Sequence, residues 1–212
     1  MGTRKRRGPW TRAELAVLEK LTDPARIQLF LNRLSYSTDP IYRCPRSVLR
    51  DRKAHCFDGA LFGAAALRRL GYPPLLVDMR AVRDDDHIIA VFRRDGCIGA
   101  VAQSNFVGMR YREPVFRTIR ELVLSYFEDF FNVDGKKTLR EYSVTLDLSR
   151  LDALSWETRD DGLHVIAARL DTIRHFPLLT TRQASALAKV DERSYRAGML
   201  GLNPAGLYKP RG

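Results

Sequence analysis

The chain has 212 residues, of which 45% are hydrophobic, so it can bury a core and fold as one domain of ordinary size. This composition excludes an intrinsically disordered chain, and no apolar run approaches the length of a membrane span. The net charge of +11 permits an acidic partner such as nucleic acid, although a solvated basic surface has the same composition.

The cysteine count and the start of the chain bear on disulfides, cofactors and cellular location. Cys44, Cys56 and Cys97 are too few, and odd in number, for a disulfide framework, and no paired Cys/His spacing predicts a metal or other cofactor. Residues 1–9 are basic with no apolar stretch behind them, which predicts a disordered tail and no secretory signal. We therefore expect a cytoplasmic protein with one domain over residues 10–212, no cofactor and no membrane partner.

Two helices are predicted at the start of that domain. Thr11 and Glu14 have the spacing of a capping box, and Asp23 followed by Pro24 is a typical start for the second helix. We expect these helices to form a cap over residues 10–39, ahead of a core at about residues 40–150.

Residues 55–70 form the most informative stretch. The pattern predicts a helix that ends at Gly71, with one face of small and apolar side chains that lets the helix lie very close to a sheet. Cys56 falls in its first turn, where unpaired backbone N–H groups and the helix dipole favour a thiolate. The alternative is a buried cysteine that serves as a small hydrophobic residue.

A β-meander is predicted after this helix. Residues 75–79, 87–94 and 97–104 read as strands, and Asp95-Gly96 is a strong signal for a two-residue hairpin turn. A helix followed by antiparallel strands predicts an α+β fold.

The elements beyond the meander are less clearly marked. We expect a helix from Pro114 to about residue 131, a strand over 141–148 and a helix over 181–199, while the rest of the C-terminal extension, 151–212, carries weak signals. A set of basic and aromatic side chains around the start of the first of these helices could hold an acidic partner, although a polar helix face is the simpler interpretation. These side chains are Arg110, Tyr111, Arg112, Arg117 and Arg120.

His87 is the candidate base for Cys56, because a thiol nucleophile needs a base within hydrogen-bond reach and a third group that orients the base. If Asp95 and Gly96 are the loop residues, His87 lies opposite Ser104 on one face of the sheet. Asn105 would then point to the other face unless a bulge shifts the register, yet its amide is chemically suited to orient an imidazole. Ser104 and Asn105 both remain candidates for the third member.

The order of these residues resembles the transglutaminase-like superfamily, whose core is papain-like. The stretch RKAHCFDGALFGAAALRRLG, at 52–71, is similar to the nucleophile helix of that superfamily, and AVAQSNF with the sequence after it resembles a bacterial branch. The resemblance covers about residues 40–150. It implies a nucleophile helix packed on an antiparallel sheet, with Cys56 as nucleophile and His87 as base.

The resemblance also implies an activity, namely attack on an amide or ester carbonyl of a peptide, protein or small molecule through a thioester. Either water or an amine would then release the acyl group. The superfamily usually has an Asp on the strand after the histidine, whereas no Asp lies between Cys97 and Phe106 here. This departure supports the alternative of a catalytically weak or inactive binding or adaptor protein that keeps the fold, with a basic face for nucleic acid.

Overall fold

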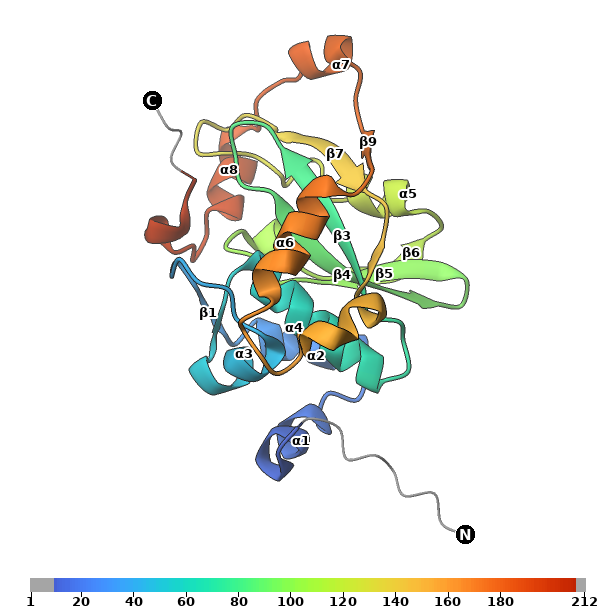
Figure 1. The fold of residues 1–212 in the computed structure, drawn as a ribbon. Helices are drawn as coiled ribbons and strands as arrows, with labels where there is room; N and C mark the ends of the chain where they lie inside the picture. Colours follow the sequence, from blue (N-terminus) through green and yellow to red (C-terminus); the bar gives the residue numbers. More distant parts are fainter. Residues whose placement is uncertain (1–9, 209–212) are drawn as a thin grey trace.

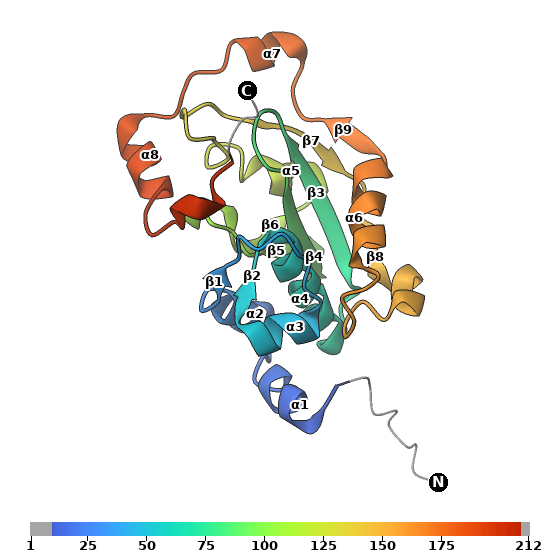
Figure 2. The same cartoon turned by 60° about the vertical axis from the view of Figure 1, so that its left-hand side comes forward.

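An antiparallel sheet of seven strands organises the structure, a computed structural model that describes residues 10–208 (Figures 1 and 2). The strands lie in the order β6-β5-β4-β3-β7-β9, and β8 pairs with the other end of β3. Their bounds are β3 (Leu75–Ala81), β4 (His87–Arg94), β5 (Cys97–Val101), β6 (Arg112–Phe116), β7 (Leu139–Ser143), β8 (Leu146–Asp147) and β9 (His175–Pro177). A separate parallel pair joins β1 (Ser35–Tyr36) to β2 (Lys53–Ala54).

Helices cover both faces of this sheet. The α-helices are α1 (Arg12–Leu18), α2 (Pro24–Leu31), α3 (Pro45–Asp51), α4 (Cys56–Arg69), α5 (Ile119–Leu124), α6 (Leu163–Thr172), α7 (Thr181–Ser185) and α8 (Glu192–Gly198). The 3₁₀ helices are η1 (Val107–Met109), η2 (Leu148–Leu154) and η3 (Pro204–Gly206). The α+β class expected from the sequence is confirmed.

Alternation along β3 and β4 separates two hydrophobic clusters. Leu76 and Ala90 face α4, and the cluster on this side also takes in α2, α3 and α6. Val77 and Ile89 point to the opposite face, where α5 and the turns after it pack. Figure 1 shows α6 in front of the sheet, beside α4, with α5 behind it. Because successive side chains of a strand point to opposite faces, one register fixes both clusters.

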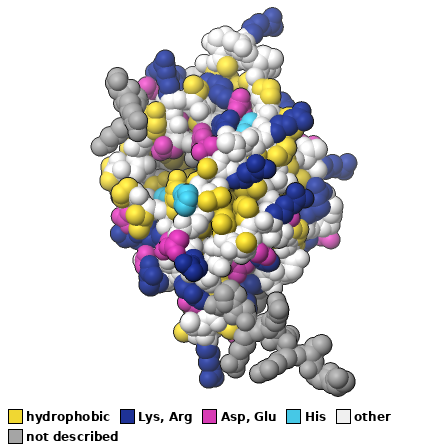
Figure 3. All heavy atoms as spheres, viewed as in Figure 1, with side chains coloured by type: hydrophobic (Ala, Val, Ile, Leu, Met, Phe, Trp, Pro, Cys, Tyr) yellow, Lys and Arg dark blue, Asp and Glu magenta, His cyan; other side chains and the backbone are white. Residues whose placement is uncertain are grey.

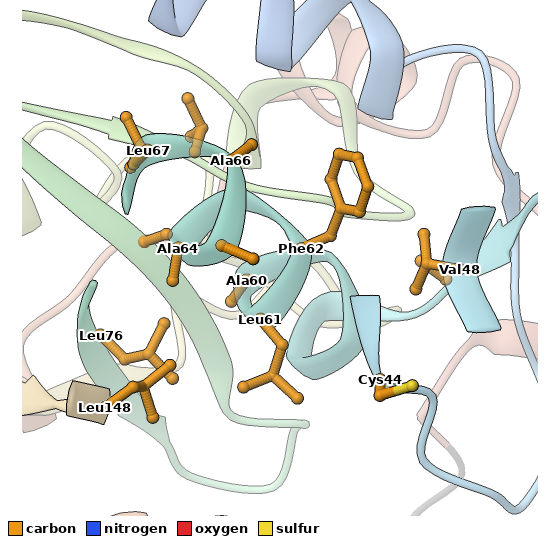
Figure 4. Packing of buried hydrophobic residues seen from close by; sticks show 14 of the residues in the cluster. Cys44, Val48, Ala60, Leu61, Phe62, Ala64, Ala66, Leu67, Leu76 and Leu148 are labelled. Carbon is orange, nitrogen blue, oxygen red and sulfur yellow. The ribbon is translucent and has the colours of Figure 1, made fainter. Parts of the chain in front are cut away.

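The small-residue face of α4 brings the helix close to the sheet, as its sequence predicts. A Cβ built on Gly59 would lie 2.2 Å from Gln103 Cβ, and one on Gly63 would lie 2.7 Å from Val101 Cγ2. Figure 4 shows α4 at the centre of the larger cluster, between Val48 of α3 on one side and Leu76 of β3 on the other. The two glycines therefore set the distance between α4 and β5.

The predicted hairpin is confirmed, but its second strand is shorter than expected. Arg94 pairs with Cys97, and the pairing of β4 with β5 ends at Ala90 opposite Val101, not at residue 104. The side-chain amide of Gln28 in α2 then bonds both backbone groups of Ala102, at 2.8 and 2.9 Å. A side chain thus takes the place of a neighbouring strand, because buried backbone groups need partners.

Three other element predictions are wrong in their bounds. Pro114 lies inside β6, an edge strand that tolerates proline, and the helix begins only after Thr118, whose side chain caps it. Residues 181–199 hold two short helices, because Asp191 caps a new helix at its start. The strand expected over 141–148 is the pair β7 and β8.

The ends of the chain complete the description. The capping box of Thr11 with Glu14 and the N-cap at Asp23 form as predicted. Trp10 and Leu31 are buried in the same hydrophobic cluster as α4. The tail predicted over residues 1–9 lies outside the described residues. Between residues 10 and 208, the helices are too short or too polar to cross a membrane.

We predict that Gly59→Ala destabilises the protein by about 3 kcal/mol, because its new methyl group would overlap Cβ of the buried Gln103, just after β5. The matched control is Arg69→Ala, on the exposed last turn of the same helix, which should change the free energy of unfolding by less than about 0.5 kcal/mol. Urea unfolding followed by circular dichroism measures both. Equal stabilities for the two variants would show that α4 can shift on the sheet.

Candidate functional site

Cys56 is the first residue of α4, and a local hydrogen-bond network fixes that helix start. His55 is the N-cap and accepts from Asp58 N, while the Asp58 carboxylate accepts from the backbone of Arg43 at 2.8 Å and of His55 at 3.4 Å. Asp58 is fully buried, and burial raises its pKa to about 7. Asp58 therefore has a structural role, because it ties α4 to the chain ahead of it.

The Cys56 thiol lies against the start of β4. Its Sγ is 3.7 Å from the carbonyl oxygen of Asp86, and the backbone N–H groups of Ile88 and Phe57 also face it. Burial raises the pKa of Cys56 to about 12, and the charges of Asp58 and Asp85 add to the rise. The N–H groups oppose this rise but do not overcome it, so the resting side chain is a neutral thiol.

His87 is the first residue of β4 and is buried, with an exposed fraction of 5%. Its Nε2 lies 2.8 Å from the carbonyl oxygen of Met109, and its ring packs edge-on against Tyr126 and Phe130. Burial and, to a smaller extent, the charge of Arg112 lower the pKa of His87 to about 4, although the bond to Met109 opposes the shift. The imidazole is therefore neutral at pH 7. Since a carbonyl oxygen only accepts, Nε2 carries the proton and Nδ1 keeps its lone pair.

The carbonyl of Met109 is held in place by the loop before β6. Arg112 donates to the carbonyl of Gly108 at 2.8 Å and lies over the Tyr126 ring, while Tyr126 Oη donates to the carbonyl of Arg110 at 2.7 Å. Arg110 itself donates to the carbonyl of Ser104 at 3.1 and 3.3 Å. Two arginines of the predicted basic set thus hold this loop together instead of forming a solvent-facing patch.

Two cavities meet at Cys56. The larger one, about 420 Å³ and open to solvent, lies on the α4 side, between β1, the start of β4, α6 and the C-terminal segment. The smaller one, about 50 Å³, is lined by all four residues that the sequence picks out: Cys56, His87, Ser104 and Asn105. Strand alternation places His87 on the opposite face of the sheet from α4. Cys56 and His87 therefore come together only as lining residues of the small cavity.

The two candidates for the third member bond elsewhere. Ser104 Oγ accepts from the backbone N–H of Phe106 at 3.1 Å. Asn105 bonds both backbone groups of Asn203, donating to the carbonyl at 2.9 Å and accepting from the N–H at 2.7 Å. The contact that orients His87 comes instead from the backbone carbonyl of Met109. Every residue has such a carbonyl, so the sequence could not predict this partner.

The C-terminal segment borders both cavities beside the thiol. Asn105 anchors it at Asn203, and Gly206 then passes so close to Tyr36 that an added Cβ would lie 2.8 Å from the ring. Gly206 borders both cavities, and Tyr208 borders the smaller one. The C-terminal extension therefore forms part of the site, which the weak signals in its sequence do not predict.

A second histidine was not predicted as part of the site. His175 of β9 bonds Asp78 of β3 through Nε2 and Oδ2 at 2.9 Å, and its Nδ1 lies 2.8 Å from the Ile173 carbonyl. Asp78 lines the larger cavity. The sequence does offer one signal, because Asp78 is an acid inside the otherwise apolar run LLVDM. Its partner His175 lies 97 residues away, so no local pattern connects the two. Over residues 10–208, His, Cys, Asp and Glu side chains form no group of three that could hold a metal ion.

We predict that the alkylation rate of Cys56 rises about tenfold per pH unit between pH 7 and 10, because the thiolate fraction of a group with a pKa near 12 grows in that proportion. Iodoacetamide labelling with peptide mapping by mass spectrometry measures the rate, and circular dichroism checks that the fold persists. A plateau that begins below pH 7 would instead indicate a thiolate–imidazolium pair with His87.

We also predict that Asn105→Ala releases the C-terminal segment while the core stays folded. Loss of two hydrogen bonds should speed amide exchange of residues 203–208 about tenfold, which hydrogen–deuterium exchange measures. Ser104→Ala is the matched control, since it removes one local bond and none to Asn203. Unchanged exchange in the Asn105 variant would mean that other contacts hold the segment.

Comparisons with known proteins do not assign a function to this chain. The chain matches no model of a known protein family, and no curated protein matches it. What the site can do must therefore be argued from Cys56, His87 and the two cavities beside them.

Proposed function

We propose that the protein is a transglutaminase-like cysteine enzyme that transfers or hydrolyses an acyl group. The observation that carries this proposal is the contact of His87 Nε2 with the carbonyl oxygen of Met109. The Nε2–H of His87 is committed to the Met109 carbonyl, so the only free ring position is the Nδ1 lone pair, in a side chain that shares a cavity with Cys56. A base of this kind, oriented by a hydrogen-bond acceptor, is what a thiol nucleophile requires.

The reaction would start from two neutral groups. As Sγ of Cys56 adds to an amide or ester carbonyl, the thiol proton passes to Nδ1 of His87 and then to the leaving amine or alcohol, which leaves a thioester. Water or a second amine attacks the thioester and restores the thiol. The N–H groups of Ile88 and Phe57, which face the sulfur, are placed to stabilise negative charge that develops beside it. The open cavity of about 420 Å³ gives a substrate access to the thiol.

In this mechanism Met109 replaces the usual carboxylate. A carbonyl oxygen fixes the tautomer and orientation of His87 but adds no full negative charge to stabilise an imidazolium. The lowered pKa of His87 agrees with this difference. Catalysis would then be slower than with an acid at that position, because the proton moves to a weaker base.

The second candidate is a binding protein that keeps the fold without the activity. The raised pKa of Cys56 and the lowered pKa of His87 favour it, since both shifts oppose proton transfer from the thiol. In this case Cys56 would be a small side chain in the wall of a ligand cavity. A basic surface for nucleic acid belongs to this candidate as well, through the net charge of +11.

We predict that p-nitrophenyl acetate acylates Cys56 and that the wild-type protein then turns over. Stopped-flow absorbance should show a burst of about one p-nitrophenol per protein, because acylation precedes thioester hydrolysis. Mass spectrometry should place one acetyl group on Cys56. Replacement of His87 by Gln should slow acylation at least about 100-fold, as expected for loss of a general base.

Cys97→Ser is the matched control for a thiol outside the site and should keep the burst, whereas Cys56→Ser should lose it. Equal acetylation of Cys56 and Cys97 in the wild type, with no effect of His87→Gln, would refute the enzyme. The binding protein would then be the better description of the site.

A further inference from the structure

The larger cavity is acidic although the chain is strongly basic. Five carboxylates line it, in a protein with a net charge of +11: Asp39, Asp78, Asp85, Asp86 and Asp171. Figure 3 shows Asp and Glu side chains and a histidine around the hollowed middle of this face, with Lys and Arg spread over the rest. The overall field of the protein attracts anions, so only local charges could draw a cation into this cavity.

One of these carboxylates has a free acceptor. Asp78 is 2% exposed, and its Oδ2 is bonded by His175 at 2.9 Å. Its Oδ1 is buried and has no hydrogen-bond partner. A buried acceptor without a donor is unfavourable, and more so when it is charged, so an unsatisfied oxygen on a residue that lines a cavity indicates a missing donor. Burial also raises the pKa of Asp78, which a bound cation would reverse.

Asp78 lies within reach of the thiol. It pairs directly with Ile88 across β3 and β4, and the backbone N–H of Ile88 faces Sγ of Cys56. Neighbouring strands are about 4.8 Å apart, so the free oxygen and the sulfur belong to one site that a single small substrate can span.

The nearby cations leave this charge largely uncompensated. Arg80 Nε lies 3.8 Å from Asp78 Oδ2, the oxygen that His175 already bonds. Arg43 pairs with Asp39. Asp85, Asp86 and Asp171 take part in no ion pair among the residues described. The cavity therefore keeps several carboxylates available to a ligand.

We propose that this cavity binds an ammonium or guanidinium group carried by the acyl substrate, with Oδ1 of Asp78 as the acceptor. The identity of the substrate rests on the proposed function, but binding of the cationic group does not. His175 acts as a positioning residue, because it bonds Oδ2 and leaves Oδ1 as the free acceptor of a side chain that lines the cavity. Asp171, on the exposed side of α6, adds negative charge at the rim without a structural bond from its side chain.

The test uses pairs of probes that differ only in charge. Nα-acetyl-arginine amide is compared with Nα-acetyl-citrulline amide, and Nα-acetyl-lysine amide with Nα-acetyl-norleucine amide. Calorimetry on full-length Cys56→Ser protein measures binding without reaction. In at least one pair the cationic member should bind at least about tenfold more tightly, the range of a hydrogen bond to a charged partner.

Three substitutions locate the effect. Asp78→Asn should abolish the preference for the cationic probe, while Asp171→Asn should reduce it about twofold to threefold and keeps the test valid if the first variant does not fold. Asp95→Asn removes the same charge from the exposed hairpin turn, outside the cavity lining, and should leave the preference unchanged. An equal loss in all three variants would indicate a general charge effect and overturn the proposal.

The outcomes separate this inference from the proposed function. Tight binding of a cationic probe without an acyl-enzyme from p-nitrophenyl acetate would keep the cation site and refute the enzyme. An acyl-enzyme without any preference for a cationic probe would keep the enzyme and refute the cation site. Failure of both cationic probes to bind more tightly than their neutral partners overturns the inference in either case.

Discussion

The close approach of α4 to the sheet is the constraint on which the rest of the structure depends. Gly59 and Gly63 remove the side chains that would separate the helix from β5, and the first turn of α4 therefore lies against the start of β4. That contact places Cys56 beside the backbone of Asp86 and Ile88. Protein interiors are packed as densely as crystals, so an added methyl group between α4 and the sheet would displace the Cys56 thiol.

The electrostatics of the site follow from this packing. Partial burial raises the pKa of the Cys56 thiol, and burial lowers the pKa of the His87 imidazole. Both groups are neutral as a result, and the acidic cavity next to them becomes the main source of charge in the site. The site thus combines a neutral thiol with a cavity lined by five carboxylates, so under the proposed function a cationic substrate would bring the charge that the site lacks.

The sequence predicts those features that local chemistry determines. The small face of α4, the turn at Asp95-Gly96 and the caps at Thr11 and Asp23 each depend on residues close together in the chain, and all of them form. Pro114 misleads because proline suits both the first turn of a helix and an edge strand. The contact of His87 with Met109 involves a backbone oxygen, which any residue has. The pair of Asp78 and His175 spans 97 residues, so no local pattern could connect the two.

The long sequence separation of these contacts has a consequence for the order of folding. The anchor of the C-terminal segment on Asn105 joins residues 98 apart. Chain synthesis releases the N-terminal part first, and contacts between distant residues form late because loop closure costs entropy. The helix, the meander and the thiol can therefore assemble before the segment that completes the cavities arrives. Before that segment docks, a newly made chain would lack one wall of both cavities, so the complete cavities form only when residues 205–208 reach the core.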